Sequence, residues 1–209
     1  KDGIVVAERK PEIVDSQGVV NTPKNIADII VKTTLAPLFS DEKFTEWDSY
    51  RIADICCGSG NFLLSAYEFI INRYIEYYMK NSLDMAIQKG LLISDVGNNF
   101  KLSYEKKREI LRNNIWGVDI DILAVEVAKF SLLIKLIEDS SLYEMESFAK
   151  NNNCRILPSL DNNIKNGNSL VDEKYIEFNS NILNDPEMVE KIKIFNWENE
   201  FAGEKFDAI

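Results

Sequence analysis

The spacing of apolar and polar residues predicts alternating helices and strands along this chain. The first helix is expected to begin at Pro23, with Thr22 as its cap, and to run to about residue 36. Its apolar face is expected to hold Ile26, Ile29, Ile30 and Thr33. Pro37 then ends this helix, and the charged residues 40–49 are interpreted as a loop.

A strand, a glycine turn and a second helix follow in that order. Residues 50–55 suit a short buried strand, and residues 57–60 form a turn that contains two glycines. Residues 61–80 then repeat apolar side chains at helical spacing, at Phe62, Leu63, Ala66, Phe69, Ile70 and Tyr74. This pattern is typical of a βα unit.

A second βα unit is predicted further along the chain. Residues 81–102 have a mixed composition and are interpreted as an insertion, after which Ser103 opens a charged, solvated helix. Residues 115–119 form another short apolar run. The helix from Asp121 to Glu138 is capped by Asp121 and is apolar over most of its circumference, so we expect it to pack against a sheet.

The last part of the chain carries weaker signals. Residues 163–170 indicate a short strand and a loop, and residues 206–209 indicate the start of another strand. The acidic stretch 172–203 is interpreted as a solvated insertion rather than a lid, with a helix from Pro186 to about Ile194. Alternating strands and helices favour right-handed crossovers onto a mostly parallel sheet, which is an α/β fold.

Composition indicates one ordinary globular domain. Hydrophobic residues make up 45% of the 209 residues, which is enough for a sizeable core. No apolar stretch approaches the roughly 20 residues of a membrane helix, and residues 1–12 do not resemble a signal peptide. We therefore expect a cytoplasmic protein without a membrane partner, with residues 1–17 as an extension and residues 18–209 as the domain.

Cysteine, histidine and charge exclude several kinds of chemistry. The three cysteines make neither a disulfide framework nor a metal site. The absence of histidine argues against zinc sites and against catalysis by imidazole. The net charge of −10 opposes nucleic-acid binding, so such a partner would need a local basic patch or another part of the protein.

The glycine turn and the end of the next strand together indicate a nucleotide-like ligand. Glycines between a strand and a helix let a ligand approach the backbone, although a tight turn alone explains Gly58 and Gly60 equally well. Asp119 ends the second strand, where a carboxylate can accept hydrogen bonds from ribose hydroxyls, and Asp121 better fits a helix cap. The alternative for Asp119 is a second capping residue.

Two other nucleotide sites fit this turn less well. A dinucleotide site normally reads GxGxxG, but this chain has Leu63 in place of the third glycine. A P-loop needs Gly-Lys-Ser/Thr after the turn, and this chain has none there. A zwitterionic ligand that carries an adenosine, S-adenosyl-L-methionine, suits the loop better.

Four segments, in this order, resemble a known family: NTPKNIADIIV, DICCGSGNFLL, IWGVDIDILAVEVAKFSLLIKL and IKNGNSLV. They are similar to the N-6 adenine-specific DNA methyltransferases of restriction-modification and phage-defence systems, over about residues 18–170 and the terminal FDAI. The resemblance implies a Rossmann-like S-adenosylmethionine-dependent methyltransferase fold that is incomplete in this chain. It also implies DNA as a partner, contacted mostly through regions outside this chain, together with restriction or defence subunits.

The resemblance further implies which residues bind the cofactor. A Thr-Pro segment lies beside its methionine part, the glycine loop encloses its amino-acid end, an acidic residue binds the ribose, and two positions contact the adenine. In that order the implied residues are Thr22, Pro23, Asp54, Cys57, Gly58, Gly60, Asp119, Ile120 and Asn168. Three positions depart from the family pattern: Asn21, Ile55 and Cys56 replace an aromatic residue, a proline and an alanine. Without the resemblance, Ile120 reads as a core residue and Asn168 as a turn former.

The catalytic tetrad of that family, Asn/Asp-Pro-Pro-Tyr/Phe, is absent from these residues. In the family its carbonyl groups bind the exocyclic amine of adenine and its aromatic ring stacks on the flipped base. No two of the five prolines here are adjacent, and residues 206–209 resemble the segment that precedes the tetrad. We therefore expect the cofactor-binding front part of such an enzyme, without catalytic residues of its own and inactive by itself.

Two other functions stay open at this point. An RNA or protein-glutamine methyltransferase can share the tetrad, although the Thr-Pro segment argues against this reading. A non-catalytic subunit could bind S-adenosylmethionine for regulation or assembly within a defence complex. The residues that follow Ile209 would discriminate these readings, because Asn-Pro-Pro-Tyr there would support catalysis.

Overall fold

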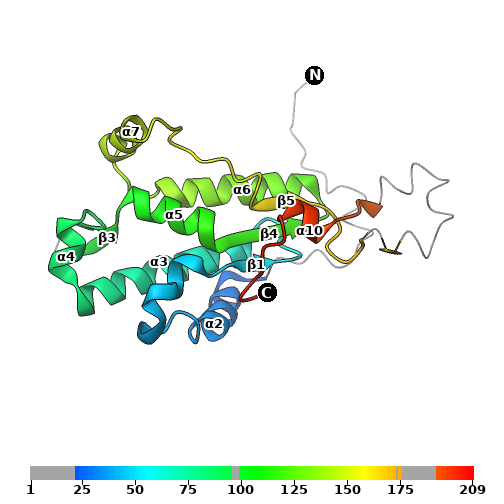
Figure 1. Ribbon diagram of the computed structural model, residues 1–209, viewed down its shortest axis with the longest axis horizontal. Coiled ribbons are helices and arrows are strands. Elements are labelled where there is room, and N and C mark those ends of the chain that lie inside the picture. Colours follow the sequence, from blue (N-terminus) through cyan, green and yellow to red (C-terminus); the bar gives the residue numbers. More distant parts are fainter. Residues whose placement is uncertain (1–21, 96–98, 173, 176–191) are drawn as a thin grey trace, which may run out of the picture.

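The computed structural model describes residues 22–95, 99–172, 174–175 and 192–209 (Figure 1). Three short parallel strands lie side by side in the order β1 (Ile52–Asp54), β4 (Ile115–Asp119) and β5 (Ile164–Asn166). Ala208 pairs in parallel with Ile52 at the other edge of β1. The predicted α/β fold with a parallel sheet, consistent with a Rossmann-like methyltransferase fold, is therefore confirmed, and residues 206–209 run beside β1.

The strand register sets the place of the polar residues that end the strands. Asp54 ends β1 opposite Gly117, and Asp119 and Asn166 end β4 and β5 directly opposite one another. Because the strands are parallel, their carboxyl ends meet at one edge of the sheet. Ligands bind at this edge in open α/β folds, so the register brings the candidate residues together there.

Helices cover one face of the sheet. The glycine turn leads into α3 (Asn61–Asn81), as predicted, and β4 leads into α6 (Ile122–Ile137). These two helices and α5 (Tyr104–Asn114) run side by side, with the strands near one end of them (Figure 1). The core between helices and sheet includes Leu63, Ala66, Ile70, Ile115, Val125, Ala128, Leu132 and Ile164.

Aromatic side chains cover the other face of the sheet. Successive residues of a strand point to opposite faces, so Trp116 and Val118 turn away from α3. They pack against Phe195, Phe201 and Phe206, which surround the short helix α10 (Trp197–Glu200). The end of the acidic segment therefore returns to the sheet.

The helix α2 (Lys24–Leu35) packs against α3, but its buried face is not the predicted one. The buried residues are Ala27, Val31 and Leu35, whereas Ile26, Ile29 and Ile30 are 43%, 62% and 46% exposed. The helix carries apolar residues on two faces, and the smaller stripe fits closely against α3. The predicted cap by Thr22 is also wrong, because Pro23 occupies the capping position and no side chain caps the helix.

Residues 40–49 form a 3₁₀ helix, η1 (Asp41–Ser49), rather than the predicted loop. Its only buried residue, Trp47, lies among the rings of Phe39, Phe44 and Tyr74. The many charged residues of this stretch obscure its two aromatic residues, Phe44 and Trp47, and their packing against neighbouring rings orders the segment.

The helix α5 begins after Ser103, as predicted, but it is not a solvated helix. Ile110 and Leu111 lie in the core, and Lys106 and Lys107 are each only 5% exposed. Both ammonium groups have acceptors, since Lys106 Nζ lies 2.6 Å from Asp48 Oδ1 and Lys107 Nζ lies 2.6 Å from the Glu138 carbonyl oxygen. Long lysine side chains can thus cross apolar surface and still reach oxygen atoms.

The predicted insertion after α3 has regular structure of its own. It contains α4 (Leu83–Gln88) and an antiparallel hairpin of β2 (Leu92–Ser94) and β3 (Phe100–Leu102), at the far end of α3 from the sheet (Figure 1). A further helix, α7 (Leu142–Asn151), follows α6. No helix among the described residues is long and apolar enough to cross a bilayer. Asn21, residues 1–17 and most of the predicted helix at 186–194 lie outside the described residues.

Candidate cofactor-binding site

The loop from β1 to α3 is held against the neighbouring strand by its own backbone. The Cys57 N–H donates to the Val118 carbonyl oxygen at 3.0 Å, and the Gly60 N–H donates to the Cys57 carbonyl oxygen at 2.8 Å. Gly58 and Gly60 both have left-handed backbone conformations, with φ of 52° and 90°. Glycine adopts this conformation at little cost, which explains why the chain can turn sharply from strand to helix here.

The glycines of this region differ in what surrounds them. A Cβ atom on Gly60 would lie 3.0 Å from Cβ of Ala128 in α6, and one on Gly117 would lie 2.8 Å from Cδ1 of Leu63. A Cβ atom on Gly58 would meet nothing within 4 Å. Gly60 and Gly117 therefore allow close packing, whereas Gly58 leaves open space above the loop.

Asp119 links the end of β4 to the glycine loop. Its Oδ2 accepts a hydrogen bond from the Gly58 N–H at 2.7 Å, and its Oδ1 accepts one from the Asp121 N–H at 2.8 Å. Asp121 caps α6 as predicted, because its Oδ1 accepts from the Leu123 N–H at 2.9 Å. Asp119 is therefore not the cap of this helix, and its carboxylate joins the two loops at the carboxyl edge of the sheet.

Two titratable side chains, those of Asp54 at the end of β1 and Cys57 in the loop, have a raised pKa. Burial raises the pKa of Asp54 above its usual range, and the nearby charge of Asp119 adds to this, partly offset by a hydrogen bond from the Cys56 N–H. Burial, together with the charges of Asp54 and Asp119, raises the pKa of the Cys57 thiol to about 12. Cys57 therefore stays protonated at neutral pH and is no nucleophile, because nucleophilic attack requires the thiolate.

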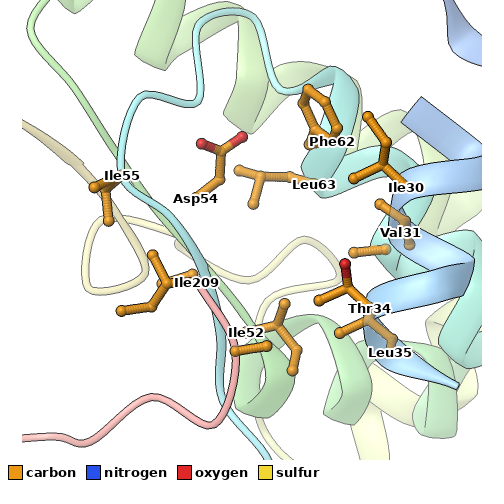
Figure 2. A pocket seen from close by; sticks show the side chains of 13 residues that line it. Ile30, Val31, Thr34, Leu35, Ile52, Asp54, Ile55, Phe62, Leu63 and Ile209 are labelled. Carbon is orange, nitrogen blue, oxygen red and sulfur yellow. The ribbon is translucent and has the colours of Figure 1, made fainter. Parts of the chain in front are cut away.

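An apolar cavity of about 260 Å³ lies beside the loop (Figure 2). Ile30, Val31, Thr34 and Leu35 of α2 line one side, and Ile55 and Ile209 lie across from them (Figure 2). Asp54 is the one residue of the predicted cofactor set that lines it. The sequence predicted that Ile30 would lie on the buried face of α2. In the structure it lines this cavity instead.

The Thr-Pro segment lies at the start of α3. The side-chain amide of Asn61, the first residue of α3, donates to the Thr22 carbonyl oxygen at 3.2 Å. Pro23 follows at the beginning of α2. The structure thus brings this segment next to the glycine loop.

The two residues expected at the adenine lie on separate loops. Ile120 is 46% exposed, so the alternative that it is a core residue is wrong. Asn168 does form a turn, because its Oδ1 accepts from the Leu170 N–H at 3.2 Å, and its own N–H donates to the Lys193 carbonyl oxygen. The turn-forming role and a cofactor role are compatible, since the side chain is only half-buried.

Sequence reasoning missed Asn166, which ends β5. Its side-chain amide donates to the Asp119 carbonyl oxygen at 2.9 Å and to the Ile120 carbonyl oxygen at 3.0 Å. It therefore fixes the backbone turn that carries the acidic residue. The only sequence signal was an asparagine at a strand end, and the cross-strand register that gives it meaning cannot be read from the sequence.

Comparison with known proteins gives consistent matches. Residues 113–209 match the family described as Eco57I restriction-modification methylase. Over 170 residues, or 81% of this chain, the sequence is 38% identical to "Type II restriction enzyme and methyltransferase RM.Eco57I" of Escherichia coli. Over 128 residues, or 60% of the chain, it is 34% identical to "Putative type II restriction enzyme and methyltransferase RM.MjaORFECS2P" of Methanocaldococcus jannaschii.

These matches cover a small part of each relative. The aligned regions make up 16% and 9% of the lengths of the two relatives. The expected resemblance to methyltransferases of restriction-modification systems is confirmed by the family match and by both relatives.

Proposed function

We propose that this chain, which resembles restriction-modification methyltransferases over most of its length, binds S-adenosyl-L-methionine as the cofactor-binding part of a DNA adenine methyltransferase. When bound, this cofactor supplies a methyl group on a sulfonium centre. The residues of this chain bind and orient it. The transfer to adenine, and contact with DNA, belong to the whole protein.

The observation that carries the proposal is the contact between Asp119 and Gly58. A hydrogen bond of 2.7 Å between Asp119 Oδ2 and the Gly58 N–H brings the acidic residue and the glycine loop within reach of one small ligand. A ribose diol can hydrogen-bond to a carboxylate in this position. The open space over Gly58 admits the amino-acid end of the cofactor.

The surroundings suit the remaining parts of the cofactor. Ile120 exposes an apolar side chain one residue after Asp119, where it can contact the face of a purine ring. On the other side of the loop, Asp54 adds a carboxylate to an otherwise largely aliphatic cavity. A carboxylate there can attract the positive charge of the cofactor, while the aliphatic walls accept its methylene groups.

Calorimetric measurement of cofactor affinity in variants of two neighbouring acidic residues tests the cofactor proposal. We expect Asp119→Asn to weaken binding of S-adenosyl-L-methionine by about tenfold or more, because it removes charge-assisted hydrogen bonds to the ribose. Asp121→Asn is the matched control, since asparagine caps helices as well as aspartate does, and its affinity should stay within about twofold of the parent. Equal affinities of the parent and Asp119→Asn would contradict the ribose assignment.

The choice of adenine in DNA is tested on the full-length protein. Digestion of the methylated DNA to nucleosides should give N6-methyl-2′-deoxyadenosine. Methyl transfer to RNA or protein would instead support the hypothesis of an RNA or protein-glutamine methyltransferase. Cofactor binding without any transfer would support a non-catalytic subunit of a defence complex.

A further inference from the structure

The end of the acidic segment returns to the candidate site along the loop that follows β5. The Asn168 N–H donates to the Lys193 carbonyl oxygen at 2.7 Å, and the Phe195 N–H donates to the Val171 carbonyl oxygen at 2.9 Å. Asn168 and Ile194 also form a parallel bridge. We refer to residues 193–197 as the brace, because they follow this loop along its length.

Side chains of the brace contact both loops expected at the adenine. Lys193 Nζ donates to the Ile120 carbonyl oxygen at 2.9 Å, and Trp197 Nε1 donates to the Ser169 carbonyl oxygen at 3.0 Å. Phe195 is 2% exposed and fills the space beside Gly167, where an added Cβ would lie 2.5 Å from its Cδ2 atom. One segment thus fixes the turn after β4 and the loop after β5 relative to each other.

Lys193 takes an unusual backbone conformation to do so. Its φ of 48° lies in the left-handed region, which is unfavourable for a residue that carries a side chain. In this conformation its carbonyl oxygen accepts from the loop of Asn168 while its ammonium group reaches Ile120. The backbone carbonyl and the ammonium group of Lys193 therefore hydrogen-bond to two different loops.

We propose that the brace positions Ile120 and Asn168 for the adenine ring of the cofactor, with Lys193 and Trp197 as positioning residues. The inference rests on the proposed function and deepens it. It gives the end of the acidic segment a role at the site, where the sequence indicated a solvated insertion. Neither residue needs to contact the cofactor, since each acts on a carbonyl group of a loop.

Two conservative variants isolate the hydrogen bonds of the brace from its packing. Lys193→Met keeps an unbranched side chain and removes the ammonium group, and Trp197→Phe keeps an aromatic ring and removes the N–H donor. Lys205→Met is the matched control, because Lys205 is an exposed lysine of the same region. Calorimetry on the 209-residue chain compares S-adenosylhomocysteine with S-inosylhomocysteine, in which an oxygen replaces the exocyclic amine.

We expect both brace variants to bind S-adenosylhomocysteine about threefold to tenfold more weakly, the range that follows from losing one hydrogen bond. The preference of the parent chain for adenine over hypoxanthine should narrow as well, because a misplaced loop no longer discriminates the two rings. Lys205→Met should match the parent in both respects. A purely structural role would lower the melting temperature or both affinities equally and leave the preference unchanged.

The possible failures are distinguishable. If the parent chain binds neither ligand, the proposed function fails and the inference that rests on it fails too. If the parent binds S-adenosylhomocysteine and both brace variants keep its affinity and its base preference, the proposed function stands and the positioning role is wrong.

Discussion

Gly58 and Gly60 lie two residues apart in the same turn, but glycine is favoured at each position for a different physical reason. Gly60 is buried against α6, and any Cβ there would press on Ala128. Gly58 has empty space beside it and a backbone N–H that holds Asp119. The sequence identified both glycines as candidate cofactor residues, but it could not separate the packing role of one from the accessible position of the other, because that difference depends on α6.

Alanine substitutions should separate these two roles. We expect Gly60→Ala to lower the free energy of unfolding by about 2 kcal/mol or more, through left-handed strain and overpacking. Gly58→Ala should cost about 1 kcal/mol, because only the strain applies. Gly203→Ala is a matched control with the same left-handed strain, at φ of 72°, and open space. Urea denaturation measures all three variants.

Cofactor affinity completes this comparison. Gly58→Ala should weaken S-adenosyl-L-methionine binding, because the new methyl group occupies the approach to the loop. Gly203→Ala should leave binding unchanged at a similar loss of stability. Equal stability losses at Gly58 and Gly60, or unchanged affinity in Gly58→Ala, would contradict the distinction.

At the scale of elements, the strongly patterned helices and strands were predictable and the anchored charged segments were not. The helix α3 follows its apolar spacing, and α6 begins at its predicted cap. The 3₁₀ helix η1 and the helix α5 were misread, because their charged residues outnumber the few side chains that anchor them. In both cases an important partner lies on a distant element, Tyr74 of α3 for Trp47 and Asp48 of η1 for Lys106, so local pattern alone could not indicate burial.

An ion pair between η1 and α5 shows how such anchoring works. Lys106 is buried and its ammonium group contacts Asp48 of η1 at 2.6 Å and Glu109 at 3.3 Å. It also lies over the ring of Tyr74, whose hydroxyl donates to the same Asp48 carboxylate. Burial alone would raise the pKa of Asp48, but the hydrogen bonds from Lys106 and Tyr74 outweigh it, and the pKa is lowered.

The lowered pKa of Asp48 predicts a pH-dependent stability. A carboxyl group whose pKa is lower in the folded than in the unfolded state stabilises the fold above its usual value of 3.8. This contribution is lost as the pH falls through the folded pKa. Asp48→Asn should therefore destabilise the chain by about 1 kcal/mol at pH 7, a modest amount because solvent screens the exposed carboxylate. The difference from the parent should shrink toward pH 3.

Urea denaturation at both pH values measures this effect, with Glu109→Gln as the control. The Glu109 carboxylate is farther from Lys106 and on the same helix, so its loss should cost less at pH 7. A constant difference between Asp48→Asn and the parent from pH 7 to pH 3 would show that the carboxylate charge is not what joins η1 to α5.

For the whole molecule, the alternation of strands and helices was enough to predict the parallel sheet, and the end of the second strand was enough to pair Asp119 with the glycine turn. The sequence could not show that the end of the acidic segment would return to this edge, because its contacts with the loop after β5 are mostly backbone hydrogen bonds. Such bonds leave no signature in residue type. The brace and Asn166 are therefore the parts of the candidate site that only the structure reveals.

The charge of the chain, and the ion pairs of its described residues, predict whether it binds DNA by itself. The net charge is −10, and many cations of the described residues already pair with carboxylates: Lys24, Arg51, Arg73, Lys80, Lys106, Lys129, Lys135 and Lys165. A phosphate backbone would have to displace these partners, and the remaining acidic groups would repel it. We therefore expect the 209-residue chain alone to bind duplex DNA only weakly, even at low salt.

Fluorescence anisotropy of a labelled duplex at about 50 mM salt, where phosphate contacts are strong, tests this expectation. No binding should be seen at micromolar chain concentrations, whereas the full-length protein should bind under the same conditions. Tight binding by the chain alone would mean that a basic surface on it contacts DNA, and target contact could then no longer be assigned to the rest of the protein.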